Sequence, residues 1–291
     1  MSKEIWADLP NSKLTFFSAG SYELFEKQAP NVQKEIKKEF TIIEEPNDKA
    51  IKKSKKLGYL PTKSKTASVN ENRGDFLPST TQMAIDYLSS RSTNGFFLMV
   101  EGGKIDWACH GNDAATVFNE VKDMDDAIKV AYEFYKKHPK ETLIVVTADH
   151  ETGGIVLGTG KYALNLKALQ YQKHSADGLS RRISELRKSK GNKVTWEDMK
   201  EFLGEEMGFW KQFPISWEQE KKLRDEFEQS FVRNKVVFAE SMYSKSEPMA
   251  ARAKEVMDQI SMVGWVSGGH SAGYVPVFAI GAGSQLFGEK D

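Results

Sequence analysis

Three short stretches of the sequence combine the carboxylates, imidazoles and glycines from which metal sites are built. The first, VEGGKIDWACH at residues 100–110, contains Glu101, Asp106 and His110. Asp106 and His110 are four residues apart, so on one helical turn their side chains point the same way. A carboxylate beside an imidazole suits Zn²⁺, which takes oxygen and nitrogen ligands in a tetrahedral shell. This stretch therefore predicts a metal site.

The other two stretches are ADHETGG at residues 148–154 and GGHSAG at residues 268–273. Asp149 and His150 are adjacent, so both can serve one centre only on a non-helical strand exit. Glycines around His270 and after His150 let the backbone approach closely. Taken singly, such residues are often capping or solvated groups. Three of the five histidines, however, lie at predicted strand ends beside an acid or a glycine cluster, which favours a shared metal centre.

Strands must position these side chains. Three apolar runs predict buried parallel strands: 96–100, 143–147 and 275–280, with a weaker edge strand at 14–17. Apolar residues at three- and four-residue steps predict a helix over about 113–137. We therefore expect a βαβ unit with a right-handed crossover. In such sheets the working residues lie just past the carboxyl ends of the strands, where these motifs fall. The two remaining histidines are expected at a helix end, His138, and in a loop, His174.

The rest of the chain is read as helices and connections. A helix is expected at 79–88 and a long surface connection at 44–72. Charged helical segments are predicted at 175–188, 195–206, 216–233 and 249–261, two of them with capping-box signals at Thr195 and Ser216. We interpret them as an insertion over one face. The predicted partition is a core α/β part at 1–158, the helical insertion at 159–262 and a return to the core at 263–291.

Composition excludes several classes of function. The 291 residues include 41 Lys+Arg and 41 Asp+Glu, so no excess positive field gathers nucleic acid or an anionic membrane. The single cysteine, Cys109, allows no intrachain disulfide and is expected to be a small buried residue. No apolar run is long enough for a membrane span, and the start has no signal-peptide core. The chain is expected to be an interior segment, and the signal of an exported parent would lie upstream.

Together the three stretches resemble the alkaline phosphatase family in order and internal spacing. The resemblance covers nearly the whole chain: residues 14–25 resemble the strand and Gly-rich turn after the family's catalytic half, and the helical insertion resembles its crown region. It implies an α/β fold, a mostly parallel sheet flanked by helices with a helical crown-like insertion. It also implies a hydrolase acting on phosphate monoesters, in a parent exported to the periplasm or outside the cell.

The resemblance also implies a role for each motif residue. Asp106, His110 and His270 match the ligands of the first zinc, which activates the attacking water in the second step. Asp149 and His150 match two ligands of the second zinc, which holds the nucleophile as an alkoxide. Glu101 matches one ligand of a magnesium site. Two metals about 4 Å apart can stabilise both the entering and the leaving oxygen of a phosphoryl transfer.

The chain departs from the family at several positions. Only thirteen residues precede Leu14, too few for the Ser nucleophile, the bridging Asp and the Thr on magnesium, and the first arginine is Arg73. We expect a C-terminal fragment with no catalytic residue of its own, nearly inactive alone. The first zinc site would be complete, the second partial. Trp107 replaces a Lys or His of some relatives, so it makes no charged contact.

Three hypotheses remain open from the sequence. The first is a zinc-dependent phosphomonoesterase of which this chain is part. The second is another two-metal relative, such as a phosphodiesterase, a sulfatase or a phosphoglycerate mutase. The third is a non-catalytic metal-binding remnant. A sheet without its first strands would leave an exposed edge and an apolar face, and a homodimer, a rearrangement or a separately supplied N-terminal piece could each cover them.

Overall fold

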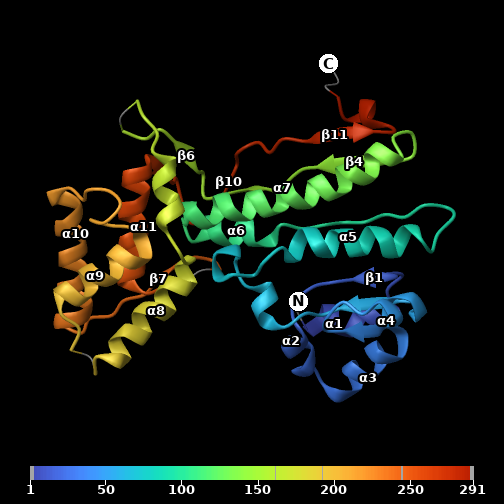
Figure 1. Cartoon of the computed structure of the whole chain (residues 1–291), viewed down its shortest axis with the longest axis horizontal. Helices are drawn as coiled ribbons and strands as arrows, with labels where there is room; N and C mark the ends of the chain where they lie inside the picture. The colour runs from blue at the N-terminus through green and yellow to red at the C-terminus, as the bar shows by residue number, and fades with distance from the viewer. Residues whose placement is uncertain (1–2, 161, 192, 244, 289–291) are drawn as a thin grey trace. The chain divides into compact units, whose positions relative to one another are not determined.

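A computed structural model describes residues 3–160, 162–191, 193–243 and 245–288, with helices and short strands interleaved along the chain (Figure 1). Its mixed helix and sheet content confirms the predicted α/β class. The chain divides into two compact units, the first made of Met1–Glu101 and Asp123–Pro139 and the second of Gly102–Lys122 and Lys140–Asp291. Helix α7 (Ala114–Lys137) contributes residues to both, close to the predicted 113–137. The three-part partition drawn from the sequence stays a prediction.

The first unit is built around a parallel sheet of three strands, in the order β1 (Phe16–Phe17), β3 (Leu57–Tyr59) and β2 (Thr41–Ile43). The predicted edge strand at 14–17 is thus confirmed. Trp6, Phe25 and Ile36 are fully buried in one hydrophobic cluster of this unit. Its other helical elements are α1 (Lys3–Asp8), α2 (Tyr22–Glu26), α3 (Pro30–Glu39), α4 (Asp48–Lys53), α5 (Phe76–Ser89) and the 3-10 turns η1 (Leu9–Asn11), η2 (Lys63–Thr66) and η3 (Val69–Glu71).

The expected surface connection at 44–72 is wrong, because this segment contains the central strand of the sheet. Leu57 and Leu60 are completely buried. At Gly58 an added Cβ would lie 2.6 Å from side-chain atoms of both Ile42 and Phe17, so only glycine lets the three strands approach this closely. A strand of three residues between lysine-rich flanks gives too short an apolar run to stand out in the sequence.

The expected parallel βαβ unit is also wrong. Residues 96–100 form no strand, and Phe97 and Met99 are 89% and 68% exposed rather than buried. Strands β4 (Leu143–Val146) and β11 (Phe278–Gly281) do form where two were predicted, but they pair antiparallel. An apolar run indicates that a strand tends to form, whereas the direction in which that strand pairs depends on which other segments lie beside it. Within the described residues no neighbouring strand is available to residues 96–100.

The pair of strands β4 and β11, here called the apolar ribbon, lie side by side in Figure 1. In the antiparallel register Phe278 and Ile280 share one face and Leu143 and Val145 the other. All four side chains are at least 39% exposed. Among the described strands, β4 pairs only with β11. The apolar ribbon is therefore hydrophobic on both faces and open at its edges.

The predicted helices of residues 175–261 are confirmed. The second unit contains α8 (Ala176–Ser189), α9 (Trp196–Met207), α10 (Trp217–Phe227) with a π-helical turn η5 (Glu228–Val232), and α11 (Pro248–Ser261). Both predicted capping boxes are present, at Thr195 and Ser216. One hydrophobic cluster joins the four helices, with Ile183, Leu203 and Leu223 fully buried. Among the described residues no helix has the length and apolar character needed to cross a bilayer.

The described residues of the second unit also form helix α6 (Gly103–His110), the turns η4 (Leu166–Tyr171) and η6 (Ser284–Phe287), and four antiparallel strand pairs including the apolar ribbon. The other three pairs are β5 (Glu151–Thr152) with β10 (His270–Ser271), β6 (Val156–Leu157) with β9 (Val263–Gly264), and β7 (Ala239–Glu240) with β8 (Lys245–Ser246). The first of these pairs brings two of the sequence motifs together.

Helix α11 carries two ionisable residues that are largely removed from water, Lys254 and Asp258. Lys254 is 6% exposed, and its ammonium group donates to the carbonyl of Gly111 at 2.5 Å. The Asp258 carboxylate accepts a hydrogen bond from the indole Nε1 of Trp265 at 3.0 Å. Burial, reinforced by the charge of Asp113, raises the pKa of Asp258 to about 8, while the bond from Trp265 and the charge of Lys254 oppose the rise.

This pKa predicts how the stability changes with pH. Folded Asp258 keeps its proton up to about pH 8, whereas the unfolded chain releases it near the ordinary value of 3.8. Between these values the folded state binds more protons, so the free energy of unfolding falls as the pH rises. Asp258→Asn should remove this part of the slope. Urea unfolding of both proteins at several pH values between 5 and 8 checks this, and parallel pH profiles would contradict it.

Candidate metal centre

Helix α6 and strand β10 bring three predicted ligands together. One helical turn separates Asp106 from His110, and the carboxylate Oδ1 of Asp106 lies 3.4 Å from the Nε2 of His110. The same oxygen lies 3.9 Å from the Nε2 of His270. One ligand atom from each of the three residues lies within 4.8 Å of the others. This spacing allows all three to share one ion.

The hydrogen bonding of His110 identifies which of its nitrogens is available. Its Nδ1 lies 2.7 Å from the carbonyl oxygen of Gly268. A carbonyl only accepts, so Nδ1 carries the hydrogen, and in the neutral ring Nε2 presents a lone pair. That Nε2 is buried, has no hydrogen-bond partner and faces a carboxylate oxygen of Asp106. Two acceptors facing each other are satisfied by a cation between them, so these residues fit a metal ion.

The second predicted pair, Asp149 and His150, lies directly beside this cluster. The His150 ring stacks on the His270 ring with centroids 3.6 Å apart. Its Nδ1 lies 3.3 Å from the carbonyl oxygen of Glu151, and its Nε2 lies 3.3 Å from Oδ2 of the exposed Asp149. As in His110, one nitrogen is held by an acceptor while the other faces a carboxylate. The His150–Asp149 pair therefore repeats the arrangement of His110 and Asp106 but is more exposed to solvent.

Sequence reasoning missed Thr152, which connects the two pairs. Its hydroxyl donates to Oδ1 of Asp106 at 2.7 Å and lies 3.2 Å from Nδ1 of His150, whose N–H it accepts. Strand pairing sets Thr152 opposite His270. Thr152 is 8% exposed. A hydroxyl two residues after a ligand histidine was the signal in the sequence, but only the strand register shows that it reaches Asp106.

Replacing Thr152 by valine keeps the shape of the side chain and removes this hydroxyl. Asp106 then loses a donor and His150 an acceptor, so both side chains are free to turn away from the shared ion. Loss of such an outer partner weakens metal binding by about 10- to 100-fold. We expect this decrease in Zn²⁺ affinity for Thr152→Val, measured by competition with a chromophoric chelator. Thr152→Ser keeps the hydroxyl and should bind as the parent does; equal weakening in both variants would contradict the role of the hydroxyl.

Glu151 supports the turn instead of facing an ion. Its Oε1 accepts the N–H of Gly154 at 2.6 Å, and its Oε2 accepts the hydroxyl of Ser271 on the paired strand. Glu101 is an exposed residue of the first unit, and its role as a magnesium ligand stays a prediction. His138 follows the end of α7, and His174 lies in the loop before α8, so their expected places are confirmed; His174 also pairs with Glu206 at 3.4 Å.

Aromatic residues line the α6 side of the cluster. Trp107 is half exposed, its ring stacks with that of Tyr243, and Tyr243 packs edge-on against His110. The ammonium group of Lys104 lies 3.7 Å from the centre of the Trp107 ring, so a cation is present beside this neutral residue. Cys109 is buried, which raises the pKa of its thiol to about 12, as expected of a small core residue.

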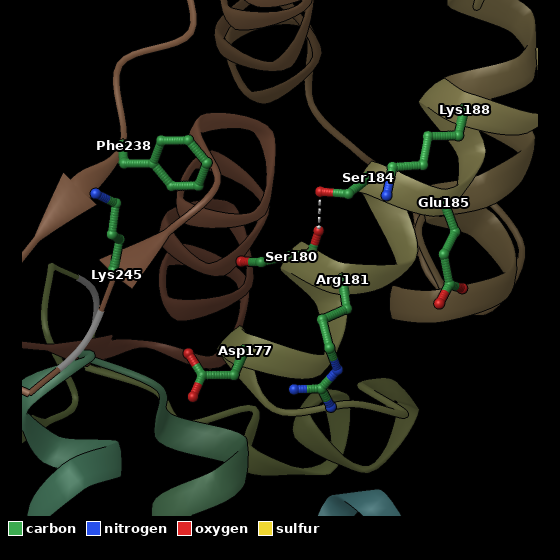
Figure 2. A pocket seen from close by; sticks show the side chains of 8 residues that line it. All are labelled: Asp177, Ser180, Arg181, Ser184, Glu185, Lys188, Phe238 and Lys245. Atoms are coloured by element: carbon green, nitrogen blue, oxygen red, sulfur yellow. Dashed lines mark hydrogen bonds between the residues drawn. The ribbon is translucent and has the colours of Figure 1, made fainter. Parts of the chain in front are cut away.

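A hollow of about 490 Å³ lies on the helical part of this unit. Figure 2 shows its lining, in which Ser184 bonds to Ser180 along α8. The lining mixes three basic and two acidic side chains and contains no residue of the histidine cluster: Asp177, Ser180, Arg181, Ser184, Glu185, Lys188, Phe238 and Lys245. These charges nearly cancel, leaving one net positive charge, so the hollow favours no ligand class and the histidine cluster is the stronger candidate.

Comparison with known proteins identifies relatives with one shared name. The family profile described as Alkaline phosphatase matches residues 54–291. Alkaline phosphatase 4 of Bacillus subtilis (strain 168) is 29% identical over 281 residues, covering 94% of this chain and 54% of that protein. Alkaline phosphatase 3 of the same organism is 31% identical over 293 residues with the same coverage. The chain therefore spans about half the length of these curated relatives.

Solved structures give the same result. The cold-active alkaline phosphatase from the psychrophile Shewanella sp. aligns with a TM-score of 0.73 and 26% identity, over 98% of this chain and 64% of that one. Alkaline phosphatase from the Antarctic bacterium TAB5 aligns with a TM-score of 0.59 and 26% identity, over 98% and 58% of the two chains. A mutant of the TAB5 enzyme has Mg bound in the site called M3, with a TM-score of 0.57, 26% identity and coverages of 98% and 59%.

Proposed function

The chain belongs to the alkaline phosphatase family, and from this premise we propose that it is the metal-binding part of an enzyme that hydrolyses phosphate monoesters. One observation carries the proposal: the buried, unpartnered Nε2 of His110 faces Asp106 beside His270. The family alone supports a phosphatase hydrolase function. The substrate class, the metals and the division of labour along the parent protein are our inferences.

We infer two zinc positions and part of a magnesium site. Asp106, His110 and His270 would hold the first ion, and Asp149 and His150 would contribute to the second. Glu101 would contribute to magnesium, which the related TAB5 mutant holds in its M3 site. When bound, such ions supply positive charge that polarises the phosphoryl group and offsets its negative charge. The chain needs this contribution because its own net charge is zero.

The residues of this chain orient the centre. The Gly268 carbonyl keeps the hydrogen of His110 on Nδ1, so Nε2 stays available as a ligand atom. Thr152 holds Asp106 and His150 in fixed orientations through one hydroxyl. Burial of His110 excludes water from one side of the cluster, which strengthens its electrostatic interactions.

We propose that the nucleophile and the phosphate-binding arginine come from sequence that the longer relatives have and this chain does not span. The relatives support this, since the chain covers only 54% of the Bacillus subtilis proteins. The only arginine in the first 90 residues, Arg73, is buried in an ion pair with Asp123 at 2.6 Å, which does not suit it to clamp phosphate. Export of the parent protein and a homodimeric assembly are further parts of this proposal.

Metal binding and phosphatase activity of the purified chain test the proposal separately. We expect the chain to bind Zn²⁺ and to hydrolyse p-nitrophenyl phosphate barely above the buffer rate with zinc and magnesium added. Absence of zinc binding would contradict the metal centre. Robust turnover by the chain alone would contradict the inferred division of labour while leaving the metal centre intact. Preference for sulfate esters or phosphodiesters in the parent would favour another two-metal hydrolase.

A non-catalytic metal-binding role would use the same cluster. The two readings separate when the chain is mixed with the N-terminal half of a close relative under metal-replete conditions. A gain in p-nitrophenyl phosphate hydrolysis that disappears in His110→Ala supports the enzyme. Zinc binding with no gain in any such mixture favours the remnant.

A further inference from the structure

Trp265 lies where the three ligand-bearing segments of the metal centre meet. It packs against the small cluster of Ala108, Cys109 and Val117, so it contacts α6, which carries Asp106 and His110. Along its own chain it leads within five residues to His270, and passes Gly268, whose carbonyl fixes His110. One side chain therefore borders α6 and begins the segment that carries His270.

The third segment, the turn after His150, lies against the same indole. Gly153 has φ +82°, and an added Cβ would lie 2.9 Å from two atoms of the indole and 3.1 Å from the carbonyl oxygen of Cys109. Backbone bonds continue the contact, since the N–H of Val266 donates to the carbonyl of Gly153 at 2.9 Å. With this little space, a tilt of the indole moves either the turn or α6.

A polar contact, not packing alone, fixes the orientation of this indole. Its Nε1 donates to Oδ2 of the Asp258 carboxyl group on α11 at 3.0 Å. One turn earlier on the same helix, Lys254 bonds to the carbonyl of Gly111, the residue after His110. An apolar contact would leave the ring free to rock, whereas the bond from Nε1 sets its angle. Helix α11 is thus linked to the neighbourhood of the ligands at two points, through Asp258 to Trp265 and through Lys254 to Gly111.

We propose that Asp258 and Trp265 are positioning residues of the metal centre: the Asp258–Trp265 hydrogen bond fixes an indole that spaces the segments carrying Asp106, His110, His150 and His270. Neither residue contacts the ion. The inference rests on the proposed metal centre and adds a determinant of its geometry outside the ligand set.

Binding of Co²⁺ to the full chain provides the test, because its visible absorption spectrum reports ligand number and geometry. Asp258→Ala removes the acceptor and should weaken Co²⁺ binding by up to about 10-fold, the lower end of the effect of losing a group bonded directly to a ligand, with an altered spectrum. Asp258→Asn keeps an acceptor oxygen for Nε1 and should restore the affinity and the spectrum of the parent. Trp265→Phe, which removes the donor, should resemble Asp258→Ala.

A matched control separates positioning from stability. Leu203→Ala creates a cavity in the hydrophobic cluster of the same unit, against which Trp265 also packs. This cluster contains none of the proposed ligands and the variant leaves the Asp258–Trp265 hydrogen bond in place, so it should leave Co²⁺ binding unchanged while lowering the melting temperature of the metal-free protein. If Asp258→Ala and Trp265→Phe lower that temperature but bind Co²⁺ as the parent does, the positioning role is wrong. If Asp258→Ala does not fold, Trp265→Phe against Asp258→Asn decides. A parent chain that binds no Co²⁺ or Zn²⁺ overturns the proposed function, and this inference with it.

Discussion

Replacing His110 by alanine will lower the affinity of the chain for Zn²⁺ by at least about 100-fold, since loss of an outer partner alone costs 10- to 100-fold. His110 is the most buried of the candidate ligands, and its Nε2 has no hydrogen-bond partner, so it is available to bind an ion. Its bond from Nδ1 to Gly268 also joins α6 to the segment before His270, so the variant loses both a ligand and an anchor. Competition with a chromophoric zinc chelator measures the change.

His138→Ala is the matched control, because His138 is exposed at the end of α7 and should contribute nothing to the affinity. Circular dichroism of the two variants without metal establishes that both are folded. Equal zinc affinity of the His110 variant and the parent would show that the cluster is not the binding site. Equal loss in both variants would indicate nonspecific binding by surface histidines.

Asp123→Ala should strongly destabilise the first unit, lowering the free energy of unfolding by about 3–5 kcal/mol. Asp123 and Arg73 form an ion pair at 2.6 Å with 9% and 6% of their side-chain surfaces exposed. Without the carboxylate, the Arg73 guanidinium keeps its positive charge in a site with little access to water. Burial raises the pKa of Asp123 against the opposing effect of Arg73, as expected of a carboxyl group that has lost hydration.

Two variants test whether the unpaired buried charge, and not a change in the helix itself, causes the loss of stability. Asp125→Ala changes an exposed acid on the same helix and should alter the free energy of unfolding by less than about 0.5 kcal/mol. The double variant Arg73→Met with Asp123→Leu removes both charges and should recover most of the loss, since apolar residues often replace a buried pair without cost. Urea unfolding measures all three. If the double variant is as unstable as Asp123→Ala, shape and not charge explains the effect.

The helices were the most predictable part of this fold. Periodicity located α7 to within a residue, and the side chains of Thr195 and Ser216 marked where α9 and α10 begin. These signals are local, because each depends on residues three or four positions apart. The strand predictions failed because strand pairing depends on segments far apart in the sequence. The run at 96–100 resembles a strand, and Leu57–Tyr59 is too short to resemble one, yet pairing with distant segments makes the second a strand and leaves the first without one.

In the candidate site, too, local spacing predicted some residues, whereas contacts between distant segments revealed the others. The four-residue step from Asp106 to His110 already placed both on one side of a helix, and the structure brings them within 3.4 Å. The family resemblance, which the comparisons confirm, linked them to His270. Thr152 and Trp265 were not found, since threonine and tryptophan are common in cores and strands. Their relation to the ligands arises from the β5–β10 register and from the close approach of the indole to Gly153.

The apolar ribbon has a practical consequence for every titration described above. Unprotected strand edges flanked by isoleucine, valine and phenylalanine promote colloidal association, in which molecules add to one another edge to edge. A concentrated sample would then scatter light, and metal added to it would partition into particles. Diluting the sample, or replacing the exposed Val145 of β4 by lysine, should keep the chain from associating, so that the measured metal stoichiometry refers to dispersed protein.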